Sequence, residues 1–252
     1  MRSLIRRIGL IVPSSNVTME SELPELFRRR ESIAPERFTF HSARMRMSSV
    51  TPEGLAAMNA QSGRCAVELA DAECDVLAYA CLVAVMADGP GAHQRAEAQL
   101  FAAAGGKAPV VTSAGALLDG IRHVGAHRIA MIAPYAPELT ARVIDYLAEE
   151  ADVDVVDSIS LNVTDNRAVG RLDPDDLLPL TDRLDLTGAE ALVLSACVQM
   201  PSLRSIEAAQ DRTSLPTLSA ATATARMLLA ALDVEPIVPG AGAVLEPALV
   251  NA

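Results

Sequence analysis

Residues 75–86 read DVLAYACLVAVM, in which the eleven residues after the aspartate carry no charge and surround Cys81. A second run, EALVLSACVQM at residues 190–200, repeats this arrangement around Cys197. A single buried cysteine is most often a small hydrophobic core residue. Two apolar runs that each contain a cysteine at a similar place instead indicate that the two thiols share one function.

The two cysteine runs belong to a longer internal repeat. RIGLIVP at residues 7–13 matches RIAMIAP at 128–134, and PVVTSAGALL at 109–118 is similar to PTLSAATATA at 216–225. Together with the cysteine runs, these landmarks recur in the same order at offsets of 121, 116 and 107 residues. Such self-similarity indicates a duplicated unit, and it predicts two similar halves related by a pseudo-twofold axis.

Short apolar runs alternate with amphipathic segments along the whole chain, which is typical of βα units built around parallel sheets. Half of the residues are hydrophobic, but only 3% are aromatic and none is Trp, so an aliphatic core is expected. We therefore predict an α/β fold of two pseudo-symmetric Rossmann-like halves, each a mostly parallel sheet flanked by helices, with the active site in the cleft between them. Strands are expected at residues 8–12, 38–43, 76–80, 110–112, 129–132, 153–159, 192–194 and 217–218. Helices are expected at residues 22–30, 52–72, 92–104, 114–124, 138–150, 174–185, 202–211 and 220–232.

Charge and hydropathy exclude several classes of protein. The net charge of −11 and the lack of a long Lys/Arg tract argue against binding to nucleic acid. The longest apolar run is shorter than the roughly 20 residues of a membrane span, and the N-terminal apolar run at 8–12 is too short for a signal peptide. A cytoplasmic protein without a membrane partner is therefore expected.

The remaining polar motifs do not predict a cofactor. The four cysteines lack C-x-x-C spacing, and free thiols are expected in a reducing compartment. His123 and His127 have helical spacing but are separated by Gly125, so no metal site is predicted. The glycine-rich segments at 88–93 and 239–243 lack the pattern of a phosphate-binding loop. The first of them follows the Cys81 run closely, which suggests a lid that excludes water.

The position of the two cysteines suits an anionic substrate. Ligands of open α/β sheets bind beyond the carboxyl ends of the strands, so the repeat places Cys81 and Cys197 across one cleft. Each lies where a strand gives way to a turn, and free backbone N–H groups there can hold a carboxylate. The same amides are expected to lower the pKa of the thiols, which react as thiolates.

Six strings carry a resemblance to a known family: GLIVPSSNVTMESELP, YACLVAVM, TSAGALL, PYAPELT, DNRAVGRLDP and LSACVQMPSL. In this order they resemble the bacterial maleate cis-trans isomerases, which belong to the Asp/Glu racemase superfamily. The resemblance spans nearly the whole chain. It implies two α/β halves, the first at 1–115 plus 220–252 because the last helix returns to it, and the second at 116–219. It further suggests a role in the degradation of nicotinate or related aromatic compounds.

The resemblance also implies a role for particular residues. Cys81 matches the cysteine that, in this family, adds to the C2=C3 bond of maleate as a nucleophile and leaves a succinyl thioether. Cys197 matches the cysteine that acts as its acid/base partner. Rotation about the resulting single bond and loss of the thiolate give fumarate, without metal, flavin or nicotinamide. Side chains implied to hold the carboxylates of this small dicarboxylate substrate are Asn16, Tyr135 and Asn166, and backbone amides are implied at Leu82, Val83, Val198 and Gln199.

Other interpretations of these residues remain open. From local sequence alone Asn16 suits a helix cap, Asn166 a turn, and Tyr135 a surface turn. Paired thiols also suit an amino-acid or hydantoin racemase, although such racemases usually carry Asn-Thr after the cysteine. An arylmalonate-type decarboxylase would keep only the second cysteine, and a solute-binding protein would have no use for a reactive thiol. A homodimer is expected because twofold symmetry is the commonest among soluble oligomers.

Overall fold

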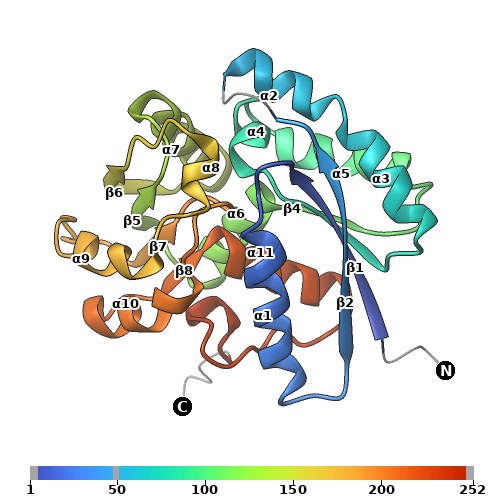
Figure 1. The fold of residues 1–252 in the computed structure, drawn as a ribbon. Coiled ribbons are helices and arrows are strands. Elements are labelled where there is room, and N and C mark those ends of the chain that lie inside the picture. The colour runs from blue at the N-terminus through green and yellow to red at the C-terminus, as the bar shows by residue number, and fades with distance from the viewer. Residues whose placement is uncertain (1–4, 48–50, 248–252) are drawn as a thin grey trace.

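The computed structural model describes residues 5–47 and 51–247 and has two separate four-stranded sheets (Figure 1). Their strand orders, β2-β1-β3-β4 and β6-β5-β7-β8, are the same when the second half is renumbered, and all the strand pairs are parallel. The prediction of a duplicated, mostly parallel α/β fold is confirmed. The strands are β1 (Ile5–Pro13), β2 (Arg37–Met45), β3 (Val76–Tyr79), β4 (Val110–Thr112), β5 (Arg128–Ala133), β6 (Asp154–Ser160), β7 (Ala191–Ser195) and β8 (Thr217–Ser219).

Helices flank both sheets, and short 3-10 turns extend some of them. The α-helices are α1 (Met19–Glu31), α2 (Pro52–Asn59), α3 (Ser62–Asp71), α4 (Leu82–Met86), α5 (Ala92–Ala103), α6 (Ser113–His123), α7 (Pro137–Ala151), α8 (Asn166–Val169), α9 (Leu177–Thr181), α10 (Ile206–Thr213) and α11 (Ala220–Ala231). The 3-10 turns are η1 (Pro174–Asp176), η2 (Leu203–Ser205) and η3 (Ala243–Leu245).

The single helix predicted over 52–72 is wrong, because the chain breaks there into α2 and α3. The side chain of Gln61, at the break, accepts a hydrogen bond from the N–H of Arg46 at 3.0 Å and donates one to its carbonyl at 3.1 Å. This pairing fixes the break beside the residue that follows β2. The predicted helix over 174–185 is also shorter, since it begins as η1 and α9 ends at Thr181.

The helices α6 and α11, which follow the repeated PVVTSAG and PTLSAAT segments, pack against each other at the centre of the molecule (Figure 1). They begin alike: Thr112 Oγ1 accepts from the N–H of Gly115 at 3.0 Å, and Ser219 Oγ accepts from Thr222 at 3.2 Å. A Cβ built on Gly120 would lie 3.0 Å from the Cβ of Ala223, so the two helices need a small residue there. The repeated motif therefore caps both helices of the central pair.

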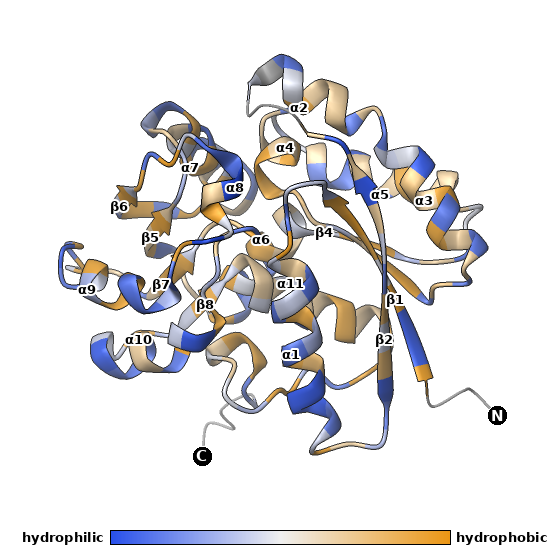
Figure 2. Cartoon of the chain, in the orientation of Figure 1, coloured by the Kyte–Doolittle hydropathy of each residue, from blue (hydrophilic) through white to orange (hydrophobic). Residues whose placement is uncertain are grey.

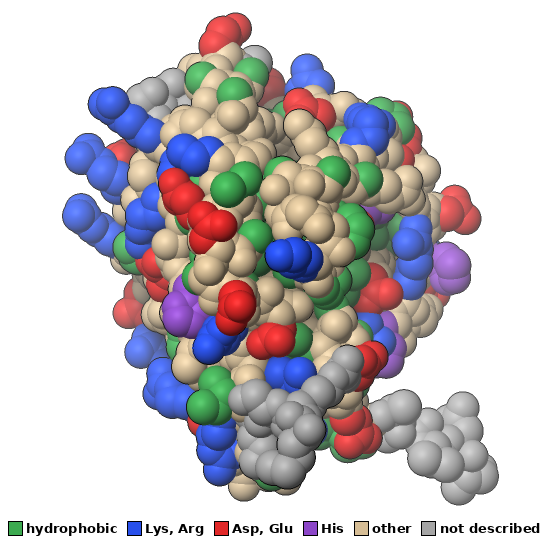
Figure 3. Space-filling model, turned by 90° about the vertical axis from the view of Figure 1, so that its right-hand side faces the viewer, with side chains coloured by type: hydrophobic (Ala, Val, Ile, Leu, Met, Phe, Trp, Pro, Cys, Tyr) green, Lys and Arg blue, Asp and Glu red, His purple; other side chains and the backbone are tan. Residues whose placement is uncertain are grey.

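The main cluster of the core is mostly aliphatic and extends over both halves, and a second cluster lies within the second half. The buried strands form the hydrophobic centre (Figure 2). Helix α11 follows a strand of the second sheet but packs on α1, β3 and β4 of the first half. This packing supports the predicted domain boundaries, which stay a prediction, and residues 1–4 and 248–252 at the ends of the first half lie outside the described residues. Acidic and basic side chains are interspersed on the face seen in Figure 3.

Candidate active site

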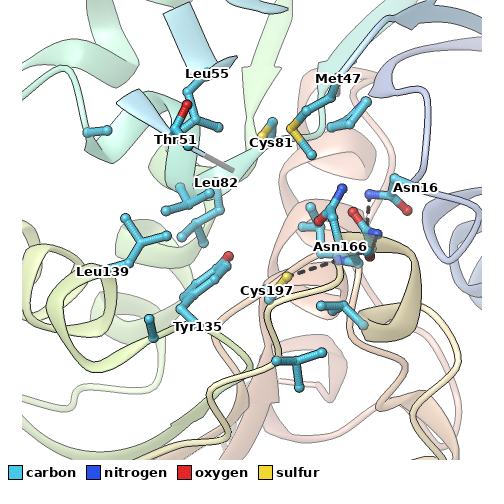
Figure 4. A pocket seen from close by; sticks show the side chains of 18 of the residues that line it. Asn16, Met47, Thr51, Leu55, Cys81, Leu82, Tyr135, Leu139, Asn166 and Cys197 are labelled. Carbon is cyan, nitrogen blue, oxygen red and sulfur yellow. Dashed lines mark hydrogen bonds between the residues drawn. The ribbon is translucent and has the colours of Figure 1, made fainter. Parts of the chain in front are cut away.

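A cavity of about 470 Å³ lies between the carboxyl ends of the two sheets. All nine site residues predicted from the sequence line it, and Figure 4 shows the thiols of Cys81 and Cys197 on different sides of the same hollow. Each cysteine is the second residue after its strand, β3 in one case and β7 in the other. The duplication therefore brings together two thiols that are 116 residues apart in the sequence.

Cys81 forms the start of α4, a short helix that the sequence did not predict because LVAVM continues the apolar run of the strand. The backbone N–H of Ala84 faces its sulfur and lowers the pKa of the thiol, but burial outweighs this effect. Burial, with a smaller contribution from negative charge on Cys197, raises the pKa of Cys81 to about 12. The expectation of a lowered pKa is wrong, because the side chain is only 6% exposed.

Cys197 is buried to the same degree, but it has more hydrogen-bond donors around its sulfur. The N–H of Gln199 donates to Sγ at 3.3 Å, and the hydroxyl of Tyr135 also lowers the pKa of this thiol by donating to it. Burial still raises the pKa of Cys197 above its usual value. Burial also raises the pKa of Tyr135 well above its usual value, so the hydroxyl keeps its proton and remains a donor.

The two cysteines affect each other's ionisation in this cavity. A thiolate on either cysteine disfavours a second one on the other, since like charges at close range raise each other's pKa. Burial keeps both groups protonated near neutral pH. When one of them loses its proton the other therefore keeps its own, and the site then holds a nucleophile and a proton donor at once.

Asn16 caps a helix and also reaches across to the second half of the chain. Its Oδ1 accepts from the N–H of Met19 at 3.2 Å, which caps the start of α1, while its Nδ2 lies 3.4 Å from the carbonyl of Val198. Asn166 begins α8 and donates through Nδ2 to the hydroxyl of Ser15. In Figure 4 both amides lie on the side of the hollow opposite Tyr135, so polar groups line its two sides.

Backbone amides are available beside each thiol. Leu82 and Val83 are the first two residues of α4, where N–H groups have no acceptor within the helix. Val198 and Gln199 follow Cys197 in the loop that leads to η2, and both are buried in the cavity wall. These four residues present main-chain donors next to the two sulfurs, as expected from their place after the strands.

Several lining residues were missed by the sequence reasoning. Apolar side chains from α2, α7 and the loops narrow the cavity, and α7 adds one acidic and one basic residue at its edge. No local pattern marks them, because only the tertiary fold brings their elements to the cleft. They are Met47, Thr51, Leu55, Glu138, Leu139, Arg142, Val163, Thr164 and Val169.

Other sequence predictions lie away from this cavity. Residues 88–93, proposed as a lid, do not line it, and the N–H of Gly91 is instead bonded to Glu150 Oε1 at 2.6 Å. All four cysteines are free and buried. Within residues 5–47 and 51–247 there is no group of three or more His, Cys, Asp or Glu suited to a metal ion. No helix in this described part is long and apolar enough to cross a membrane.

Comparisons with known proteins agree on one family. A family model described as arylmalonate decarboxylase (Amdase) matches residues 8–245. The chain is 55% identical over 243 residues to a maleate isomerase of Geobacillus stearothermophilus, covering 95% of this chain and 96% of that protein. It is 51% identical to a maleate isomerase of Alcaligenes faecalis, again covering 95% and 96%.

Solved structures give the same result. A cysteine-to-alanine variant of the maleate isomerase from Pseudomonas putida S16, crystallised with maleate, superimposes with a TM-score of 0.94 at 47% identity, covering 97% of this chain and 98% of that one. A mutant Nocardia farcinica maleate cis-trans isomerase with a covalently bound succinylcysteine intermediate gives 0.91 at 48% identity, covering 96% and 98%. Unliganded arylmalonate decarboxylase, at 20% identity and a TM-score of 0.74, shares the fold.

Proposed function

This chain belongs to the maleate isomerases, within the family described as arylmalonate decarboxylase, and from that membership we propose how its own residues convert maleate into fumarate. The enzyme isomerises the double bond through a covalent cysteine adduct. The observation that carries the residue assignments is the pair of thiols that face one closely lined cavity from equivalent strand ends. The roles given below to individual residues are our proposal.

Binding must hold two carboxylates that lie on the same side of a rigid double bond. We assign one carboxylate to the amides beside Cys81 and the other to those beside Cys197, with the two asparagine amides completing the donor set. The single hydroxyl proton of Tyr135 is directed at the carboxylate while Cys197 is a thiol, and at Cys197 Sγ when it is a thiolate. Hydrogen bonds to a charged acceptor are the strongest neutral-donor contacts available in a buried site. The donors are Asn16, Leu82, Val83, Tyr135, Asn166, Val198 and Gln199.

The first chemical step is addition. Cys81, after releasing its proton to solvent, attacks C2 of maleate as a thiolate, and the electron pair of the double bond moves toward C3 and its carboxylate. Cys197 then protonates C3 from its thiol, which leaves a succinyl thioether on Cys81 and a thiolate on Cys197. Amide and hydroxyl donors stabilise the enediolate-like charge in the manner of an oxyanion hole.

The raised pKa of Cys81 is compatible with this step. A value of about 12 makes the thiolate about 7 kcal/mol less favourable than the thiol at neutral pH, at roughly 1.4 kcal/mol for each pH unit. A turnover of about 10 per second corresponds to a barrier of about 16 kcal/mol. Ionisation therefore uses less than half of that barrier, and a desolvated thiolate is a stronger nucleophile than a solvated one.

The second half of the reaction reverses the addition after rotation. The C2–C3 bond of the thioether is single, so the two carboxylates rotate to opposite sides. The Cys197 thiolate removes a proton from C3, the double bond forms again, and the C2–S bond breaks with its electron pair returning to Cys81. Cys197 is then a thiol again, and the Cys81 thiolate either attacks the next maleate or takes back a proton from solvent. No external oxidant, reductant or cofactor enters the balance.

The alternatives raised by the sequence are not favoured by any particular observation. The relatives that cover nearly the full chain at about half identity are maleate isomerases, whereas arylmalonate decarboxylases share the fold at about one fifth identity. Racemases carry Asn-Thr after the cysteine, whereas here Leu82-Val83 and Val198-Gln199 stand in those places and line the cavity. We therefore do not propose racemisation or decarboxylation.

We further propose a cytoplasmic homodimer that acts in the degradation of nicotinate or related aromatic compounds. Four free thiols suit a reducing compartment, and twofold dimers are the commonest soluble oligomers. The pathway is supported by the family resemblance, which suggests a degradation route that ends in maleate. Size-exclusion chromatography with light scattering tests the oligomeric state directly.

Proton NMR of maleate incubated with purified protein tests the function. We expect the vinyl signal of fumarate to appear with the wild type in the absence of added cofactor, and not with Cys81→Ala. Conversion by Cys81→Ala at the wild-type rate would remove Cys81 from the mechanism. Unchanged maleate with reduced, folded wild-type protein would overturn the activity itself.

A further inference from the structure

The start of α1, in the first half, is bonded to the loop that carries Cys197 in the second half. We call residues 197–203 the Cys197 loop. Thr18 Oγ1 donates to the carbonyl of Gln199 at 2.7 Å. Glu22 Oε1 accepts from the N–H groups of Ser202 and Leu203 at 2.6 and 2.7 Å. The loop is therefore held at its middle and at its far end by one face of α1.

Thr18 makes this contact instead of capping its own helix. It stands directly before the first residue of α1, where a threonine hydroxyl usually accepts from an amide of the first turn. No such bond is made, and the side chain, which is only 2% exposed, points across to the other half. The only side-chain acceptor described for an amide of this first turn is Asn16 Oδ1, which accepts from Met19. The favoured local interaction has thus been replaced by one that fixes the Cys197 loop.

Glu22 is an unusual residue to find between two halves of a protein. Its side chain is 7% exposed, and its second oxygen, Oε2, has no hydrogen-bond partner within residues 5–47 and 51–247. Burial raises the pKa of Glu22, whereas the two loop amides and the charge of Arg29 lower it. Burying a carboxylate is unfavourable unless hydrogen bonds compensate for the lost water. The hydrogen bonds that Glu22 accepts come from the two amides at the end of the Cys197 loop.

The near end of this loop carries the chemistry. The N–H of Gln199 donates to Cys197 Sγ, and Val198 and Gln199 line the cavity. A shift of the loop by even a fraction of an ångström would change both the direction of these amides and the position of the sulfur. Misplacement of about 1 Å is enough to reduce turnover about a hundredfold.

We propose that Thr18 and Glu22 are positioning residues that hold the Cys197 loop in the geometry that proton transfer to and from C3 requires. This inference rests on the proposed role of Cys197 as the acid/base partner. Neither residue lines the cavity, so both act through the loop rather than by touching the substrate. The two halves are thereby locked to each other at the point where the active site depends on their relative position.

The test compares Glu22→Ala with Glu25→Ala and Glu22→Gln. Glu25 is on the same helix but is bonded to Arg28 and Arg29 on its exposed side, which makes its variant a matched control. We expect Glu22→Ala to lower kcat about tenfold to a hundredfold. Glu22→Gln keeps an oxygen acceptor for both amides and should remain within about threefold of the wild type. Circular dichroism at the assay temperature confirms that each variant is folded.

A second readout separates positioning from loss of stability. Alkylation by iodoacetamide, mapped by peptide mass spectrometry, should become faster at Cys197 in Glu22→Ala and stay unchanged at Cys81. Equal acceleration at both thiols, or a kcat within about threefold of the Glu25→Ala value, would overturn the proposal. If Glu22→Ala does not fold, Thr18→Val makes the same comparison with a nearly isosteric change, and an unaltered kcat there would overturn it. A wild type without activity would instead refute the proposed function.

Discussion

The hydroxyl of Tyr135 gives the sharpest test of how the second thiol is tuned. Tyr135→Phe removes the side-chain donor to Cys197 Sγ. It leaves the aromatic ring, the cavity wall and the N–H of Gln199, 3.3 Å from the sulfur, in place. A hydrogen bond to a charged group contributes about 1.5–3 kcal/mol. Because one tenfold change corresponds to about 1.4 kcal/mol, kcat/KM should fall about tenfold to a hundredfold, and the pKa of Cys197 should rise further.

The matched control is Tyr146→Phe. Tyr146 is buried in α7, and its hydroxyl lies 2.7 Å from His93 Nδ1 rather than in the cavity. The assay follows the vinyl signals of maleate and fumarate by proton NMR, with unfolding curves for both variants. We expect Tyr146→Phe to lose stability while kcat/KM stays within about threefold of the wild type, since its hydroxyl has a structural partner only. If Tyr135→Phe were as active as Tyr146→Phe, the hydroxyl would not act on the reaction.

Three further perturbations test other parts of the structure. Because the pKa of Cys81 is about 12, its thiolate fraction still increases above about pH 8.5, the usual pKa of a cysteine. We therefore expect kcat/KM to keep rising through about pH 8.5, and a plateau there would contradict the assignment. Gly9→Ala places a Cβ 2.6 Å from Leu77 Cδ2, and urea unfolding should show a loss of about 1–3 kcal/mol; unchanged stability would show that Leu77 moves aside freely. Arg142→Gln removes a cation from the cavity edge and should raise KM about threefold with kcat unchanged; a lowered kcat would place Arg142 in the chemistry.

Much of the fold follows from local sequence patterns. All eight expected strands are present, because apolar runs closed by Pro, Ser or Gly are a strong signal for buried parallel strands. The internal repeat by itself identifies the two cysteines as equivalent positions. The helix break at Gln61 was missed, because the side-chain contact made there is with Arg46, which is distant in sequence. The short helix α4 was missed as well, since its five residues are as apolar as the strand that precedes them.

The site was predictable only in part, for a physical reason. Residues directly after equivalent strands must converge on one cleft, so Cys81, Cys197 and their following amides could be placed from the duplication alone. The side walls come from α2 and α7, whose contribution depends on how the halves pack. The direction of the thiol pKa shifts could not be predicted from sequence either. Burial raises the pKa of both thiols by more than the local amides lower it, and burial depends on the whole fold.

The central claim is that Cys81 forms the carbon–sulfur bond and Cys197 moves the proton. Cys197→Ser and Cys81→Ser, each incubated with maleate, quenched with acid and digested, allow the adduct to be mapped by peptide mass spectrometry. The account predicts a succinyl group on Cys81 in the Cys197→Ser protein and no adduct in the Cys81→Ser protein. A succinyl group on Cys197 of Cys81→Ser, with Cys81 unmodified in the other variant, would contradict the assignment and exchange the roles of the two thiols.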